Sequence, residues 1–175
     1  MTSIKVRPET HDDIKAIDVV NLSAFQGEVE AKFVTAMRKT PDFKPEMSLV
    51  AEFNGRIVGH VLMSRVTLRK DTGEVSVLVL GPMSVVPSQS HRGIGTELIK
   101  AAIEKARTLH FGAIVVIGHP EYYRRSGFEN AGKWNLHFSM QVDKDAVTAM
   151  ELIKGTLEGG GKITLPPHFS DIVSD

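Results

Sequence analysis

The 175-residue sequence contains no cysteine. This absence excludes structural disulfides, thiolate zinc sites and a thiol nucleophile, and it fits the reducing environment of the cytoplasm. Basic and acidic side chains balance at 21 each, so no overall field would attract nucleic acid or anionic lipid. No two histidines have the spacing of a metal site on one helix, so we expect no metal.

Long apolar runs are also missing. No segment approaches the ~18 apolar residues that a membrane-crossing helix needs, and residues 1–7 lack the apolar core of a secretory signal. The composition, 42% hydrophobic and 24% charged, is typical of globular proteins. We therefore expect a soluble, cytoplasmic protein that binds no membrane and no nucleic acid. Residues 1–175 are predicted to form one domain, with a core over about residues 3–142 and a C-terminal helix and tail in residues 143–175.

The first part of the chain predicts helices and then antiparallel strands. A strand-like alternation stops at Pro8, and Thr10 with Asp13 marks the start of a helix, which a second helix follows from about Glu28. Asn54-Gly55 then joins two β-rich runs, and this dipeptide suits a type I′ hairpin turn.

A further strand is predicted over residues 75–86, and Gly81-Pro82 inside it indicates that strand pairing is interrupted there. An amphipathic helix follows Gly95 and ends near His110. The apolar run 113–117 is typical of a buried strand, and the strand–helix–strand order predicts that it lies parallel to the strand 75–86. Beyond it we expect a short helix over 120–126, one or two strands over 134–142, a last helix over 145–154 and a tail that wraps the domain.

The turn that contains Gly93 and Gly95 lies between a strand and an amphipathic helix. Such a turn exposes unpaired backbone N–H groups at the positive end of the helix dipole, which together suit a phosphate group, and Arg92 adds a cation. An ordinary turn with a helix cap explains the same residues. The turn is neither the three-glycine dinucleotide fingerprint nor a P-loop, because the third glycine and the Gly-Lys-Ser/Thr sequence are missing.

Three segments resemble, in order and spacing, the signatures of the GNAT superfamily of N-acetyltransferases: residues 80–87 (LGPMSVVP), 92–95 (RGIG) and 122–128 (YYRRSGF). Within this family, the run GHPEYY at residues 118–123 is similar to a bacterial subgroup labelled YhbS-like predicted acetyltransferases. The phosphate loop departs from the family pattern at Ser90, where the family usually has Gln or Arg.

The resemblance implies an α/β (α+β) fold with a mixed, mostly antiparallel central sheet flanked by helices. In this fold the parallel strands 75–86 and 113–117 splay apart at the cofactor site, and the cofactor is acetyl-CoA as co-substrate. The strand backbone at Met83, Ser84 and Val85 would contact the pantetheine arm and the thioester carbonyl. The implied pyrophosphate loop consists of His91, Arg92, Gly93, Ile94, Gly95 and Thr96.

The same resemblance implies that Tyr123 protonates the departing CoA thiolate, which a phenol with a pKa of about 10 can do. A packing role for Tyr123 is the alternative, and the base that accepts the amine proton is left open among Glu28, His119 and Glu121. We expect an N-acetyltransferase that acts on a small-molecule or peptide amine by direct attack in a ternary complex. A non-catalytic acyl-CoA sensor and a domain for another phosphorylated metabolite are the alternatives. Monomer and homodimer are both left open.

Overall fold

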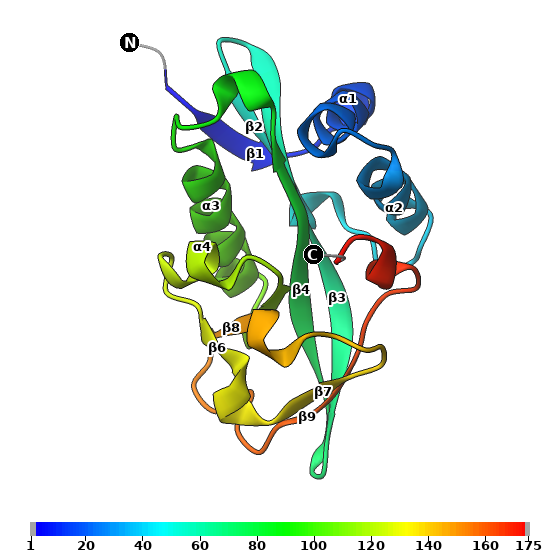
Figure 1. Ribbon diagram of the computed structural model, residues 1–175, viewed down its shortest axis with the longest axis vertical. Helices are drawn as coiled ribbons and strands as arrows, with labels where there is room; N and C mark the ends of the chain where they lie inside the picture. The colour runs from blue at the N-terminus through cyan, green and yellow to red at the C-terminus, as the bar shows by residue number, and fades with distance from the viewer. Residues whose placement is uncertain (1–2, 174–175) are drawn as a thin grey trace. The chain divides into compact units, whose positions relative to one another are not determined.

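The computed structural model describes residues 3–173, and its helices and strands are labelled in Figure 1. Contact clustering divides these residues into two units. The first unit comprises residues 3–63 and 82–105, and the second comprises residues 64–81 and 106–173. This division neither confirms nor contradicts the single domain that the sequence predicts, which therefore stays a prediction.

The described residues contain four α-helices: α1 (Ile14–Phe25), α2 (Val29–Arg38), α3 (Ile94–Thr108) and α4 (Pro120–Arg124). They also contain nine strands. These are β1 (Lys5–Pro8), β2 (Ser48–Phe53), β3 (Arg56–Lys70), β4 (Gly73–Val85), β5 (Ala113–Ile117), β6 (Glu129–Asn130), β7 (Leu136–Phe138), β8 (Val147–Glu151) and β9 (Gly161–Thr164).

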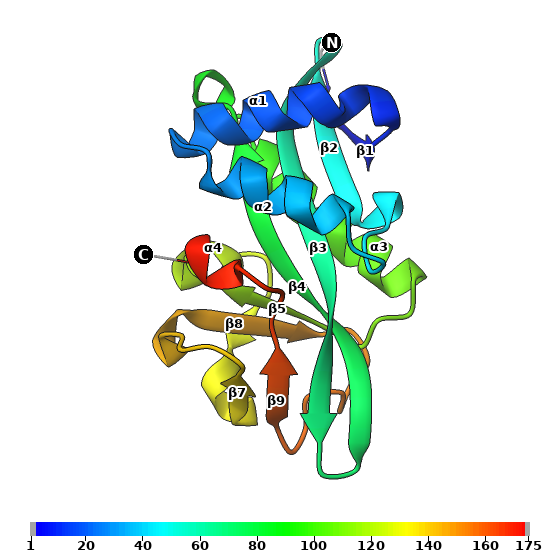
Figure 2. The ribbon, with the colours of Figure 1, turned by 90° about the vertical axis from the view of Figure 1, so that its right-hand side faces the viewer.

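In the first unit, β1, β2 and β3 pair antiparallel, with Val6 opposite Ala51 and Ala51 opposite Gly59. Asn54 and Gly55 have φ values of 55° and 74°, the left-handed angles that a type I′ turn requires, so the predicted hairpin is confirmed. Helices α1 and α2 cover one face of these strands and α3 lies on the other (Figures 1 and 2). The predicted pair Thr10 and Asp13 caps a 3-10 turn (His11–Asp13) that leads directly into α1, and the Thr10 backbone N–H donates to the Asp13 carboxylate at 2.7 Å.

In the second unit, β4 pairs parallel with β5 through Leu78–Ile114, Val79–Val115 and Leu80–Val116. Strand β5 also pairs antiparallel with β8, and β8 pairs with β6. The fold is therefore the expected mixed, mostly antiparallel sheet with a parallel β4–β5 pair and flanking helices. A second parallel pair, between β7 and β9, was not predicted.

The predicted last helix over residues 145–154 is wrong, because residues 147–151 form strand β8. Val147, Thr148 and Ala149 are all at most 1% exposed, which a surface helix would not allow for three consecutive residues. Val and Thr are β-branched and suit a strand with partners on both edges. The apolar spacing of this segment looked helical, but strand pairing with β5 and β6 overrides it.

One neighbouring prediction needs new bounds, and another is incomplete. Trp134 ends a 3-10 turn (Ala131–Trp134), and the strand in the predicted range 134–142 covers only β7. The tail contains β9, which pairs with β3 and β7, so it does more than wrap the domain. A Cβ on Gly161 would lie 2.3 Å from the Arg69 carbonyl oxygen, so only glycine allows β9 to approach β3 this closely.

Candidate functional site

The glycine turn begins helix α3 in the first unit, as the sequence predicts. His91 and Gly93 adopt left-handed angles, with φ of 70° and 79°, and the Glu97 N–H donates to the Gly93 carbonyl at 3.0 Å. The backbone N–H groups in this first turn of a helix have no intrahelical acceptor. With the positive end of the helix dipole they form a site that suits an anion such as a phosphate group.

Two side chains of the turn have defined partners. The Arg92 guanidinium carbon lies 4.9 Å from the centroid of the Phe53 ring, at the end of β2, which holds this exposed cation beside the turn. The Ser90 hydroxyl donates to the Pro87 carbonyl oxygen at 2.9 Å. Ser90 therefore stabilises the turn itself, at the position where the family usually has a longer side chain.

Helix α3 packs directly on β3 because residue 59 is glycine. A Cβ on Gly59 would lie 2.9 Å from Ile94 Cγ2 and 3.1 Å from Leu98 Cδ1. A contact below 3.0 Å is essentially never seen for a real Cβ, so with a larger residue here the Ile94 side chain or the first turn of α3 must shift. The same Cβ would lie 3.2 Å from the Ser84 carbonyl oxygen, which places the start of α3 next to the end of β4.

The end of β4 presents backbone groups on two edges. The Val86 N–H donates to the Val58 carbonyl at 2.9 Å, and the Ser84 carbonyl oxygen lies beside Gly59, 3.2 Å from the position of a Cβ there, so these residues face β3. Because backbone groups alternate along a strand, the N–H and C=O groups of Met83 and Val85 face the opposite edge. Among the described residues, the register of β4 with β5 ends at Leu80, and Gly81 follows with a φ of 141°.

The side chain of Ser84 anchors the end of β4 to helix α1. Its hydroxyl donates to Asn21 Oδ1 at 2.9 Å, and Asn21 Nδ2 donates to the Ile17 carbonyl at 3.2 Å. Asn21 is fully buried and Ser84 is 3% exposed. This contact ties the end of β4 to α1 and fixes the orientation of the strand backbone on either side of Ser84.

Tyr123 lies in the second unit, on the short helix α4, and is 5% exposed. It makes edge-to-face contacts with Tyr122 and Phe128, with ring centroids 5.3 and 5.8 Å away. Gly127, with a φ of 99°, reverses the chain so that Phe128 returns to this ring. Burial, with a smaller contribution from Tyr122, raises the pKa of the Tyr123 phenol well above its usual value.

The three candidate bases have different surroundings. Glu28 precedes α2 and forms an exposed ion pair with Lys32 at 3.2 Å. Glu121 is exposed and pairs with Arg124, whereas His119 has left-handed backbone angles at the start of α4. Glu28 belongs to the first unit with the phosphate turn, and the other two belong to the second unit with Tyr123.

Sequence reasoning missed Asn21 and the role of Gly59. The available signal for Asn21 was a polar residue on the apolar face of an amphipathic helix, between Ile17 and Phe25. Within residues 3–173 no cluster of three or more His, Asp or Glu side chains could hold a metal ion. None of the helices described is both long and apolar enough to cross a membrane.

Comparison with known proteins adds independent observations. The model of the Acetyltransferase (GNAT) family matches residues 16–128. An uncharacterized N-acetyltransferase, YjhQ of Escherichia coli, is 33% identical over 117 residues, which cover 67% of this chain and 65% of YjhQ. The uncharacterized N-acetyltransferase YhbS of the same species is 25% identical over 94% of this chain and 98% of YhbS.

Two crystal structures are similar over almost the whole chain. The GNAT family N-acetyltransferase YhbS from Escherichia coli, in complex with CoA, has a TM-score of 0.88 at 24% identity and covers 97% of this chain and 93% of its own. A GNAT family acetyltransferase from Brucella melitensis, in complex with acetyl-CoA, has a TM-score of 0.77 at 26% identity and covers 95% and 98%. The overall chain path therefore matches solved structures of this type.

Proposed function

Because the chain belongs to the acetyltransferase (GNAT) family, we propose that it transfers the acetyl group of acetyl-CoA to a primary amine of a small molecule or peptide. One observation carries this proposal: Gly59 brings the glycine turn and the first turn of α3 next to the end of β4, where backbone groups of Met83 and Val85 face away from β3. The similar structures with bound CoA and acetyl-CoA support the same cofactor.

In this proposal the turn from His91 to Thr96 binds the pyrophosphate, mainly through backbone N–H groups, and Arg92 adds a positive charge. The residues present fit such a group, since left-handed angles at His91 and Gly93 direct the turn into α3 without a large side chain at residues 93 and 95. Met83 and Val85 bind the pantetheine arm and the thioester oxygen, and Ser84 holds their strand in place through Asn21.

The amine nitrogen attacks the thioester carbonyl carbon and loses one proton to water or to the base that is still open, while the carbon–sulfur bond breaks and CoA leaves as the thiol after its sulfur takes a proton. Backbone N–H groups on β4 stabilise the oxyanion, and alignment of the two substrates supplies much of the rate. Tyr123 donates to the thiolate. Because burial raises the pKa of its phenol, Tyr123 stays protonated throughout the working pH range, but it is a weaker proton donor than an exposed tyrosine. The rate increase that Tyr123 supplies should therefore lie at the lower end of the range for general acids.

A non-catalytic acyl-CoA sensor is the second candidate. It is favoured by Ser90, whose hydroxyl bonds within its own turn, and by the exposed ion pairs that engage the candidate bases Glu28 and Glu121 with Lys32 and Arg124. Release of free thiol from acetyl-CoA in the presence of an amine panel separates this sensor from an enzyme.

The first test is calorimetric titration of the folded protein with acetyl-CoA, CoA and ATP. We expect saturable binding of acetyl-CoA and CoA and none of ATP. Binding followed by amine-dependent thiol release supports the transferase. Binding without release from any amine in the panel supports the sensor, and no binding contradicts both.

A further inference from the structure

The contact between Arg92 and Phe53 places a cation beside the β2–β3 hairpin, within the first unit. Phe53 is the last residue of β2 and is partly exposed, and the Arg92 guanidinium carbon lies 4.9 Å from the centroid of its ring. A cation–π contact of this kind restrains the guanidinium. Among residues 3–173 Arg92 has no ion-pair partner and no hydrogen-bond acceptor, and its side chain is exposed. Its donors are therefore held in place and available to a ligand.

A second guanidinium projects from the same face of this hairpin. Phe53 and Arg56 are register partners at the end of the β2–β3 ladder, on either side of Asn54-Gly55. Residues directly opposite each other in an antiparallel pair project to one face, with Cβ atoms about 4.5–5.5 Å apart. Arg56 is exposed and, in the part of the chain that the structure describes, it also has no ion-pair partner. The Phe53 ring therefore has two neighbouring cations, Arg92 and Arg56, which we call the arginine pair.

The acidic side chains closest in sequence to the arginine pair already have partners. Glu52 accepts from Arg7 at 2.7 Å and, as the strand neighbour of Phe53, projects from the opposite face of the sheet. Glu97, in the first turn of α3, lies 3.7 Å from Lys100. Two neighbouring cations repel each other, and an anion bound between them reverses the sign of this interaction. The arginine pair therefore fits a ligand group that carries more than one negative charge.

CoA contains such a group in addition to its pyrophosphate. A phosphate monoester is attached to the same ribose, and we call it the ribose phosphate. A phosphate monoester has a charge of about −1.5 to −2 at pH 7 and three acceptor oxygens. Guanidinium groups match phosphate oxygens in a forked, bidentate geometry, so two of them suit a dianion. The pyrophosphate, in the function proposed above, is bound mainly by backbone N–H groups of the turn at residues 91–96.

We propose that Arg92 and Arg56 bind the ribose phosphate of acetyl-CoA and that Phe53 is the positioning residue for Arg92. This inference rests on the proposed function, because it assigns a second phosphate of the same cofactor. Since Arg92 directly precedes Gly93, its charge also acts on the pyrophosphate at the turn. Arg56 lies on the hairpin instead, so its charge acts chiefly on the ribose phosphate.

Calorimetric titration with CoA and with dephospho-CoA, which lacks only the ribose phosphate, isolates this subsite. The unchanged protein should bind CoA at least about 10-fold more tightly than dephospho-CoA, the factor expected for one charged hydrogen bond. Arg56→Met should weaken CoA binding by a similar factor and leave the affinity for dephospho-CoA unchanged. Arg92→Met should weaken both, and CoA by the larger factor.

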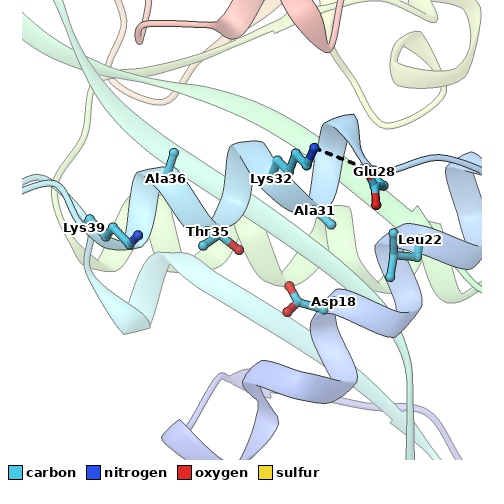
Figure 3. Close-up of a pocket in the computed structure, with 8 residues that line it drawn as sticks. All are labelled: Asp18, Leu22, Glu28, Ala31, Lys32, Thr35, Ala36 and Lys39. Carbon is cyan, nitrogen blue, oxygen red and sulfur yellow. Dashed lines mark ion pairs between the residues drawn. The ribbon is translucent and has the colours of Figure 1, made fainter.

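Lys39→Met is the matched control for the lost charge. Lys39 is exposed and belongs to the first unit, where it lies at one end of a groove of about 350 Å³ between α1 and α2 (Figure 3). The substitution changes the net charge as Arg56→Met does but leaves the arginine pair intact. Both affinities should therefore stay those of the unchanged protein. An equal loss of CoA affinity in Lys39→Met and Arg56→Met would reduce the effect to net charge and overturn the proposal.

Phe53→Leu tests the positioning role. Loss of an exposed cation–π contact should weaken CoA binding about 2- to 5-fold, with a smaller effect on dephospho-CoA. Phe53→Trp supplies a better ring for a cation and should bind CoA as tightly as the unchanged protein, which a merely structural role for Phe53 does not predict. Phe43→Leu is the control, because it removes the ring 5.6 Å from Arg38, in the same unit, and should leave the ratio of the two affinities unchanged.

The possible results separate this inference from the function on which it rests. If folded protein binds neither CoA nor dephospho-CoA, the acetyl-CoA function and this inference are both contradicted. If it binds the two with equal affinity, or if Arg56→Met keeps the affinity ratio of the unchanged protein, only this inference is overturned. Unchanged CoA affinity in Phe53→Leu overturns the positioning role of Phe53.

Discussion

The Ser84 hydroxyl donates a hydrogen bond of 2.9 Å to Asn21 Oδ1, in a region where neither residue is more than 3% exposed. Because Ser84 lies between Met83 and Val85, this contact with α1 holds the part of β4 that we assign to the pantetheine arm. A buried polar pair such as this is costly to break singly, since the remaining group loses its partner.

Ser84→Ala should lower the free energy of unfolding by about 1–3 kcal/mol, because it leaves Asn21 Oδ1 buried without a donor. Asn21→Ala should cost a similar amount. Since the two residues form one contact, the double variant should be less destabilised than the sum of the single variants by about 0.5–3 kcal/mol. Urea unfolding of all four proteins measures this coupling, and strictly additive losses would show that the contact contributes nothing.

Gly59→Ala tests the close packing of α3 on β3. The new Cβ would lie 2.9 Å from Ile94 Cγ2, so the first turn of α3 must shift or the protein must accept an overpacking cost of about 1–3 kcal/mol. We expect weaker binding of acetyl-CoA by calorimetry together with lower thermal stability.

Gly27→Ala is the control for this substitution. The nearest atom to a Cβ at Gly27, the Phe25 carbonyl oxygen, is 3.9 Å away, an ordinary contact. Gly27→Ala should therefore leave acetyl-CoA affinity unchanged. If Gly59→Ala binds acetyl-CoA as tightly as this control does, the turn tolerates the shift and Gly59 has no role in cofactor binding.

Tyr123→Phe removes the proposed donor to the thiolate and keeps the ring contacts with Tyr122 and Phe128. With an amine that the unchanged protein acetylates, kcat should fall about 100-fold, the lower end of general-acid effects, because burial makes this phenol a weak acid. Acetyl-CoA affinity should stay the same. Tyr122→Phe is the matched control, and equal turnover in the two variants would reduce Tyr123 to a packing residue.

The sequence allowed prediction of those elements whose signals are local. Asn54-Gly55 fixes a turn through its own backbone preferences, and Gly93 with Gly95 marks the start of α3 in the same way. Strand β8 has no such signal, because Val147 to Ala149 form a strand through pairing with β5 and β6, which are distant in sequence. The Asn21–Ser84 contact joins residues 63 positions apart, so it too required the folded chain.

A second buried polar cluster links β3 to the N-terminal segment. Ser48 donates to Glu9, which also accepts from Arg38 at 2.7 Å, and His60 Nε2 lies 2.9 Å from the Ser48 hydroxyl oxygen. Since the Ser48 proton is directed to Glu9, His60 Nε2 must carry the proton that it donates to Ser48. His60 Nδ1 is then an acceptor that is buried without a partner.

Burial, reinforced by the charge of Arg38, lowers the pKa of His60 from 6.5 to about 3. The unfolded chain therefore binds a proton near pH 6.5 that the folded protein does not, so this contribution to stability is complete above pH 6.5 and is lost progressively as the pH falls toward 3. At about 1.4 kcal/mol per pH unit, roughly 2 kcal/mol is lost by pH 5.

His60→Gln should flatten the dependence of unfolding free energy on pH between 4 and 6.5, even if the substitution also changes the unfolding free energy at pH 7. The exposed His11→Gln should keep the slope of the unchanged protein, and an equally steep slope in His60→Gln would show that this histidine titrates alike in both states.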